Sequence, residues 1–314
     1  MGSRRAGEGA RRRPGGRSVI VFCGYANLDV VGRVPRFPRP DERVHATAVE
    51  HLSGGMAANA ASAAARAGAD VAFAGVVGAD PLSDRFLAEL AADGADVGWT
   101  ARTAFLSTAI VLVDGEGRRS VVSQDDALDA AHVTAVADRL AAAGGGYLCL
   151  DGYRAAALAG AARPGVTLAV DLDGCDDRAD ALTAIGRADH VVVGRARLAQ
   201  LLDVPAASWQ ELATGRRTTL VVTDGPAGWT LHGADGRLVT EPALEVDVVD
   251  DTGAGDCFTG TYLAGLDAGL PPARAAVRAG AAASLSCTVP GARGAPSPAL
   301  VDAALGQPAA TPSP

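Results

Sequence analysis

The sequence predicts an α/β fold in which helices cover both faces of a central, mostly parallel β-sheet. Between residues 132 and 193, short apolar runs alternate with helix-compatible segments, and such alternation indicates βαβ units. The apolar runs are continuous, as in strands that are buried on both faces of a parallel sheet. With 314 residues, 48% of them hydrophobic, the chain is long enough for one large core or two domains.

The expected elements can be placed in chain order from these patterns. The first is a buried strand at 18–23, and a strand near 44–48 follows a proline-rich stretch. A hairpin is expected at 108–114 and 118–123, around the glycine turn 115–117. The other expected strands lie at about 71–77, 147–150, 167–171, 190–193, 218–223 and 246–249. The expected helices lie at about 56–67, 80–93, 132–143, 153–162, 178–186, 256–268 and 274–287.

Composition excludes several classes of function. The net charge of −8 disfavours nucleic-acid binding by bulk attraction. All 28 basic residues are arginines, so a P-loop, which needs a lysine, is excluded. No apolar stretch is long enough to span a membrane. The five scattered cysteines show no Cys-x-x-Cys spacing and indicate reduced core residues. We therefore expect a cytoplasmic protein with no nucleic-acid or membrane partner.

The stretch from Asp251 to Asp256, Asp-Thr-Gly-Ala-Gly-Asp, is the most informative part of the chain. A small-residue turn that opens a helix aims free backbone N–H groups at an anion, and Asp256 falls on the first turn of that helix. A carboxylate beside an anion hole suits phosphoryl transfer, because the amides stabilise the moving phosphoryl group and the carboxylate takes the acceptor hydroxyl's proton. Two alternatives are a plain helix N-cap and an aspartic protease, although a protease needs two such loops in an all-β fold.

Two earlier elements carry polar groups and glycines. Asn27 and Asp29 project to one side at the end of the first strand, where they suit sugar hydroxyls or, alternatively, a simple turn. The pair Gly54-Gly55 opens a helix that contains Asn59. Two glycine turns that feed two helices favour a site for two ligands.

These three elements occur in the order seen in the ribokinase family, also called the PfkB family of carbohydrate and nucleoside kinases, which the chain resembles from about residue 19 to 305. The matching residues are Gly24, Asn27 and Asp29, then Gly54, Gly55 and Asn59, and then Asp251 to Asp256. The resemblance implies a ribokinase-like fold with a small β lid from about 29–52 and 102–124. It also implies ATP-dependent phosphorylation of a primary hydroxyl of a small, ribose- or ketohexose-like sugar. The alternatives are a nucleoside kinase of the same family and a catalytically weak sugar-binding regulator.

The same resemblance implies roles for individual residues. It makes Asp256 the catalytic base and implies ATP and Mg²⁺ as cofactors, with K⁺ as a monovalent cation. The implied anion hole consists of Gly253, Ala254 and Gly255, and the implied sugar pocket of Asn27, Asp29, Gly54, Gly55 and Asn59. The implied nucleotide-binding residues are Thr223, Gly225 and Gly228, and the implied ligands of the monovalent cation are Asp250 and the loop 288–297.

Departures from the family pattern bear on the ligands. Where many members carry Asn-x-x-Glu, which supports the Mg²⁺ water network, this chain has Gly194 and Arg197. Either the metal binds more weakly or an arginine contacts phosphate. Met56 replaces a lysine after the glycine pair, which disfavours an anionic sugar unless Arg43 or Arg102 reaches the pocket. Only 4% of residues are aromatic, a thin supply for stacking a base, and this favours a free sugar over a nucleoside.

The domain organisation follows from these boundaries. Residues 1–17 and 306–314 are expected to be disordered tails, the first of them rich in arginine and glycine. Residues 18–305 are expected to form a single kinase domain with a small-molecule sugar and ATP as its partners. A homodimer formed through the lid is a further expectation.

Overall fold

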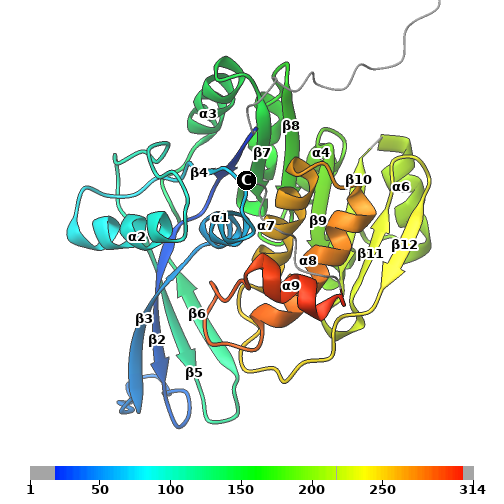
Figure 1. Cartoon of the computed structure of the whole chain (residues 1–314). Coiled ribbons are helices and arrows are strands. Elements are labelled where there is room, and N and C mark those ends of the chain that lie inside the picture. The colour runs from blue at the N-terminus through cyan, green and yellow to red at the C-terminus, as the bar shows by residue number, and fades with distance from the viewer. Residues whose placement is uncertain (1–17, 217, 307–314) are drawn as a thin grey trace, which may run out of the picture.

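The computed structural model describes residues 18–216 and 218–306. The predicted tails at 1–17 and 306–314 lie outside these residues, except Gly306, which follows the last helix in a turn. The described residues form a larger sheet covered by helices and a smaller sheet that projects to one side of it (Figure 1).

Within the described residues, the larger sheet has eight strands in the order β12-β11-β10-β9-β8-β7-β1-β4. Its strands are β1 (Val19–Cys23), β4 (Val71–Phe73), β7 (Gly146–Asp151), β8 (Val166–Asp171), β9 (His190–Gly194), β10 (Thr219–Thr223), β11 (Trp229–His232) and β12 (Leu238–Glu241). Neighbouring strands from β10 to β4 run parallel, while β11 and β12 form an antiparallel edge. The predicted mostly parallel sheet is therefore confirmed.

Helices cover both faces of this sheet (Figure 1). They are α1 (Met56–Arg66), α2 (Pro81–Ala92), α3 (Ala130–Ala142), α4 (Arg178–Ile185), α5 (Arg195–Leu202), α6 (Trp209–Arg216), α7 (Ala254–Asp267), α8 (Pro272–Ser286) and α9 (Pro298–Ala304). Consecutive side chains in a strand point to opposite faces. In β1, Val21 and Cys23 therefore pack into a core with α3 to α6, whereas Ile20 and Phe22 pack into a second core with α1, α2, α7 and α8. None of these helices combines the length and the apolar composition needed to cross a membrane.

The smaller sheet has the strand order β3-β2-β5-β6 and is called the lid sheet below. Its strands are β2 (Asn27–Arg33), β3 (Ala48–Gly54), β5 (Ser107–Val113) and β6 (Arg119–Ser123). The last two form the predicted hairpin, and β2 pairs in parallel with β5. The small β lid implied by the family resemblance is thus present.

The valine-rich run at 246–249 is not a strand, contrary to the sequence prediction. Val248 and Val249 are 64% and 61% exposed, and the Val249 amide donates to the carbonyl of Cys287, at the end of α8, at 2.8 Å. The sheet already ends at β12 on this side, and the run pairs with no strand of the described chain. β-branched composition favours an extended backbone but cannot supply a neighbouring strand.

Smaller differences concern boundaries and short elements. The strand predicted near 44–48 begins only at Ala48, and the helix predicted at 153–162 is a 3₁₀ helix at Gly152–Gly160. β4 ends at Phe73, before the predicted boundary at 77. The sequence did not predict α5, α6, α9 or β12. All five cysteines are free in the structure, and four of them are buried.

Candidate active site

The predicted site residues lie near the carboxyl ends of the parallel strands. The chain leaves β1 toward β4 on one side and returns at β7 on the other, so the strand order reverses between β1 and β7. Open α/β sheets bind ligands at such a switch point. Here the Tyr25 amide, just after β1, donates to the Asp151 carboxylate at the end of β7. A Cβ at Gly24 would lie 2.2 Å from that carboxylate, so this close approach requires glycine.

The turn before α7 has the free amides that the sequence predicted. Gly253 is the N-cap of α7 with a φ of +76°, and a Cβ there would lie 2.4 Å from the carbonyl oxygen of Ala292. The Ala254 amide donates to the Asp251 carbonyl at 3.2 Å. The amides of Gly253 and Gly255, by contrast, donate to no acceptor among the described residues. These N–H groups, at the positive end of the helix dipole, can stabilise an anion.

Asp256 lies on the first turn of α7 and is held by Asn59 of α1. The Asn59 Nδ2 donates to the Asp256 Oδ2 at 2.8 Å. Burial raises the pKa of Asp256 well above its usual value, the charges of Asp171, Asp173 and Asp151 raise it further, and the Asn59 hydrogen bond partly offsets the rise. A carboxylate with a raised pKa accepts protons more readily, which suits a general base.

Asp171 and Asp173 extend this acidic group at the end of β8. The Asp171 Oδ2 accepts a hydrogen bond from the Thr259 hydroxyl at 2.6 Å, and the Asp173 Oδ1 accepts one from the Gly194 amide at 2.7 Å. Burial raises the pKa of both carboxylates. The Asp173 Oδ2 lies 3.6 Å from the place where a Gly255 Cβ would stand. The sequence signal for Asp173, an Asp-Leu-Asp pattern that closes a buried strand, was not recognised.

Asn27 and Asp29 lie on one face of β2, as predicted, and contact each other. The Asn27 Nδ2 donates to the Asp29 Oδ1 at 2.6 Å, and burial raises the pKa of Asp29. A Cβ at Gly54 would lie 2.5 Å from the Asp29 carboxylate, so glycine leaves room for these side chains. Gly55 follows as the N-cap of α1, with a φ of +101°. Within the described residues, this polar cluster makes no direct hydrogen bond to Asp256.

The predicted nucleotide loop follows β10. Thr223 ends that strand and pairs with Gly194 at the end of β9. Gly225 and Gly228 both have positive φ, +50° and +95°. A Cβ at Gly228 would lie 2.1 Å from the carbonyl oxygen of Glu241, whereas a Cβ at Gly225 would meet no atom within 4 Å. Gly228 therefore has a packing reason to be glycine, and Gly225 leaves its backbone open to a ligand.

Asp250 joins two loops beside α7. Its Oδ1 accepts hydrogen bonds from the Thr252 amide at 3.0 Å and the Thr252 hydroxyl at 2.6 Å, and its Oδ2 accepts one from the Gly291 amide at 3.0 Å. Burial acts to raise the pKa of Asp250, but these hydrogen bonds outweigh it and lower the pKa. The carboxylate therefore stays ionised, as a cation ligand must, and the loop 288–297 reaches it as the resemblance implies.

Arg102, Arg195 and Arg197 differ in their partners. Arg195 pairs with Asp224, and Arg102 pairs with a carboxylate of α2. Each of these two arginines therefore already has a carboxylate partner. Arg197 makes no hydrogen bond or ion pair with the described residues, although its charge partly offsets the raised pKa of Asp173.

Two arginines that the sequence did not single out also lie at the site. Arg119, in β6 of the lid sheet, is 3.2 Å from Asp251 and 4.0 Å from Asp250. Arg293, in the loop before α9, donates from Nε to the Asn59 Oδ1 at 3.3 Å. Arg119 and Asp251 are 132 positions apart in the chain, and Arg293 and Asn59 are 234 positions apart. No local sequence pattern could therefore have indicated these contacts.

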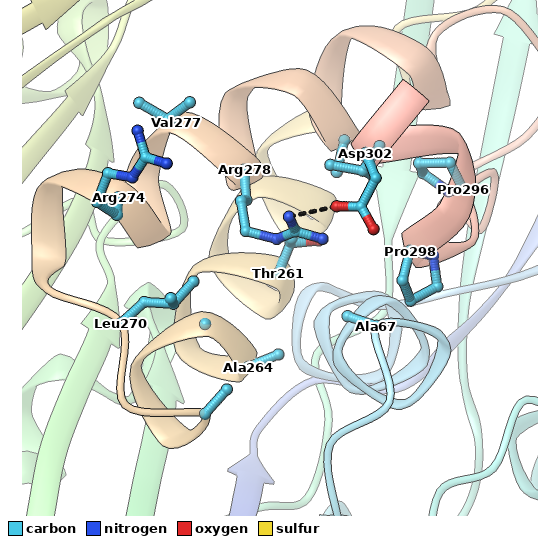
Figure 2. A pocket seen from close by; sticks show the side chains of 14 residues that line it. Ala67, Thr261, Ala264, Leu270, Arg274, Val277, Arg278, Pro296, Pro298 and Asp302 are labelled. Carbon is cyan, nitrogen blue, oxygen red and sulfur yellow. Dashed lines mark hydrogen bonds and ion pairs between the residues drawn. The ribbon is translucent and has the colours of Figure 1, made fainter. Parts of the chain in front are cut away.

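A cavity of about 370 Å³ lies elsewhere, between α7, α8 and α9. Its lining is mostly apolar, and Arg278 and Asp302 form an ion pair within it (Figure 2). None of the predicted site residues lines this cavity. The candidate active site is therefore the group of polar residues and free amides at the strand ends and at α7.

Comparison with known proteins shows the family to which the chain belongs. The model of the pfkB family of carbohydrate kinases matches residues 18–300. The chain is 30% identical over 298 residues to the ATP-dependent ribose-1-phosphate kinase of Halopiger xanaduensis, an alignment that covers 92% of this chain and 98% of the relative. It is 28% identical to the acarbose 7(IV)-phosphotransferase of an Actinoplanes species, over 93% of this chain and 98% of the relative. Ribokinase from Thermotoga maritima has the same fold, with a TM-score of 0.80 at 23% identity over 92% of this chain and 99% of that chain. The chain belongs to the pfkB family of carbohydrate kinases and is a phosphotransferase.

Proposed function

We propose that the protein transfers the γ-phosphoryl group of ATP to a primary hydroxyl of a small sugar. The observation that carries this proposal is at α7, where Asp256 directly follows the free amides of Gly253 and Gly255. Asp256 takes the proton of the acceptor hydroxyl, and the amides stabilise negative charge on the transferred phosphoryl group. Asn27 and Asp29 bind hydroxyls of the sugar.

The nucleotide is proposed to lie between the loop after β10 and the start of α7. Gly225 leaves an open backbone there, and the chain has no lysine to hold phosphate. Phosphate binding therefore relies on backbone amides and on Arg197, which has no partner among the described residues. Residues 18–305 act in this proposal as one kinase domain, placed in the cytoplasm where ATP is available.

Mg²⁺ is proposed to enter with the nucleotide. Within the described part of the chain, no three His, Cys, Asp or Glu side chains stand close enough together to hold a metal ion. This fits Mg²⁺, which is commonly bound through substrate phosphates and only one or two carboxylates. Asp173, beside Gly255, is the carboxylate that would hold it, and the ion would neutralise phosphate charge.

A sugar is favoured over a nucleoside as the acceptor. Asn27 and Asp29 supply hydrogen-bonding groups, and buried polar groups discriminate strongly against ligands that leave them unpaired. Tyr25 is not free to stack on a base, because its ring packs against Tyr153 at 5.2 Å and its hydroxyl bonds the Ser107 hydroxyl at 2.9 Å. The relative from Halopiger is named for ribose 1-phosphate, which makes that phosphorylated sugar a second candidate acceptor.

Measuring ADP release with a panel of acceptors tests the proposal. Ribose, fructose, ribose 1-phosphate, adenosine and inosine would be compared at equal concentration with saturating Mg-ATP. We expect turnover with at least one sugar and little with the nucleosides. Turnover with the nucleosides alone would make the sugar assignment wrong. Binding of a sugar without any ADP release would favour the sugar-binding regulator instead.

A monovalent cation is proposed to bind at Asp250 and the loop 288–297. The ionised carboxylate links that loop to the anion hole, so an ion there would stabilise the turn before α7. Potassium should then raise turnover over sodium or choline at matched ionic strength. Equal rates in the three salts would argue against this site.

The lid sheet is proposed to form a homodimer through its outward face. The strand register places Val30, Ile110 and Val122 on the face opposite Asp29, and Ile110 and Val122 are 53% and 69% exposed. Contiguous exposed apolar surface of this kind marks interaction sites. In sedimentation equilibrium, Ile110→Arg should convert a dimer to a monomer, whereas the control Leu238→Arg, at a 58% exposed position of β12, should not. A monomeric wild-type protein would contradict the proposal.

A further inference from the structure

Arg293 contacts the group that holds the proposed base. It lies in the loop between α8 and α9, and its guanidinium packs over the ring of Phe86 in α2, 4.9 Å from the centroid. Its Nε donates to the Asn59 Oδ1 at 3.3 Å, and the Asn59 Nδ2 donates to the Asp256 Oδ2 at 2.8 Å. Three residues from separate parts of the chain therefore form one hydrogen-bonded series that ends at the base.

The chemistry of these groups fixes the direction of the series. A guanidinium can only donate, and an ionised carboxylate can only accept. The amide of Asn59 has one oxygen that accepts and one nitrogen that donates, so it can satisfy both neighbours in only one orientation. Without Arg293, the amide could rotate and turn its oxygen toward the Asp256 carboxylate, where two acceptors would repel each other.

Arg293 is not explained as an ordinary structural ion pair. Its Nη1 and Nη2 are buried and find no acceptor among the described residues, and burial lowers its pKa. The charges of Asp93 and Glu89 act on Arg293, but these two carboxylates are already paired, Glu89 with Arg85 and Asp93 with Arg66. A buried cation with unpaired donors is unfavourable for stability. Stability alone does not favour a buried arginine at position 293, but its hydrogen bond to Asn59 gives a functional reason for it.

We infer that Arg293 is a positioning residue that orients the Asn59 amide and, through it, the carboxylate of Asp256. The inference rests on the proposed function, because it takes Asp256 as the base. With Oδ2 bound to Asn59, the Asp256 Oδ1 accepts no hydrogen bond within the described residues and is left for the acceptor hydroxyl. Small displacements of a catalytic group lower turnover strongly, so the effect of Arg293 belongs in kcat and not in substrate binding.

The experiment is a double-mutant cycle between Arg293 and Asn59, with kcat and KM measured for the best acceptor of the panel. Arg293→Met should lower kcat by about tenfold, part of the contribution of a positioned base, while KM for ATP and for the acceptor changes less than about threefold. In an Asn59→Ala background the same substitution should have no further effect on kcat, because residues that act through one another are not additive. Arg293→Leu, which also lacks a donor, should reproduce the loss if the Met variant folds poorly. Arg293→Gln, whose amide nitrogen takes the position of the arginine Nε and can still donate to Asn59, should recover much of the lost kcat.

Arg139→Met is the matched control. Arg139 also stacks on an aromatic ring, 3.9 Å above the centroid of Trp99, but has no contact with the site. It should lower the melting temperature without changing kcat. Independent, multiplicative losses from Arg293→Met and Asn59→Ala would overturn the inference, as would an unchanged kcat in both Arg293→Met and Arg293→Leu. If Asp256→Asn retained turnover, the proposed function would fail instead, so the two failures are distinguishable.

Discussion

Asp256 combines burial with a negative charge among other carboxylates. Burial and the charges of Asp171, Asp173 and Asp151 raise its pKa, so at a pH where a surface aspartate is ionised it still retains part of its proton. Beside it, the amides of Gly253 and Gly255 are free to donate to an anion at the start of the helix. Its surroundings thus make the Asp256 carboxylate a strong proton acceptor, and the sequence places it directly after the free amides of Gly253 and Gly255.

Asp256→Asn removes the proton acceptor but keeps the shape of the side chain. Turnover should fall by about 100-fold or more, the scale of a positioned base, while KM for the acceptor changes little. The melting temperature at neutral pH should not fall, because a buried charge has been removed. In the wild type, turnover should rise with pH as Asp256 loses its proton. Near wild-type turnover in the variant would remove Asp256 from the mechanism, and Asp247→Asn, at an exposed position, is the control.

At this scale, local motifs predicted part of the site. Asn59 follows the Gly54-Gly55 turn and Asp256 follows the Gly253–Gly255 turn, and the structure brings these two residues into contact. Asn27 and Asp29 lie on one face of β2, as the alternation of residues indicated. Arg293 could not be predicted in the same way. Its position over Asn59 depends on how the loop before α9 folds across α1 and α2, and no periodicity within that loop encodes this.

Among the elements, the lid sheet contacts the body of the molecule through Arg119. The guanidinium reaches from β6 to Asp251 at 3.2 Å and to Asp250 at 4.0 Å, and it is 49% exposed. An exposed ion pair contributes at most about 1 kcal/mol and weakens with salt. The contact therefore links the lid sheet only weakly to the loop before α7.

Arg119→Ala should raise KM for the acceptor by a factor of about two to five, as the loss of an exposed ion pair implies, with little change in kcat. In the wild type, KM should rise toward the variant's value as ionic strength is increased with choline chloride at constant potassium. Arg33→Ala breaks a pair with Glu50 inside the lid sheet and should leave KM unchanged. A salt dependence of KM that persists in Arg119→Ala would show that another charge is responsible.

The elements themselves were predictable where local patterns and neighbours agreed. The hairpin of β5 and β6 and the buried strands β7 to β10 follow from turn glycines and continuous apolar runs. The run at 246–249 has the same composition, but it lies beyond the last strand of the sheet and bonds to the end of α8 instead. A strand forms only beside another strand that has free backbone donors and acceptors. The composition of a short segment does not show whether such a neighbouring strand is available.

For the whole molecule, the acidic group at the strand ends links stability to pH. Burial raises the pKa of Asp151 to about 7, and the charge of Asp171 adds to this. The other ionisable groups that interact with Asp151 are Cys23, Cys149, Tyr153 and Asp256. An unfolded aspartate loses its proton near pH 4. Between about pH 4 and 7 the folded state therefore binds more protons than the unfolded state, and its stability falls as pH rises.

Asp151→Asn tests this link, because asparagine cannot ionise and still accepts from the Tyr25 amide. The free energy of unfolding, measured in urea from pH 4 to 8, should fall less steeply in the variant. At pH 8 the variant should be more stable by a few kcal/mol, at roughly 1.4 kcal/mol for each unit of pKa difference, and the two proteins should converge near pH 4. Asp176→Asn, at an exposed position, should follow the wild type. Parallel curves for Asp151→Asn and wild type would contradict the prediction.

The pairing inside the lid sheet also has a consequence for the order in which the molecule assembles. Its central strands β2 and β5 come from distant parts of the chain, since Asn27 pairs with Ser107, 80 positions later. Such long-range pairings carry a high loop-closure entropy and form slowly. The intervening α1, β4 and α2 belong to the core of the larger sheet, and their folding brings the two strands together. The proposed acceptor-binding surface is therefore completed late, and a partly unfolded chain would lose it while most of its larger sheet is still intact.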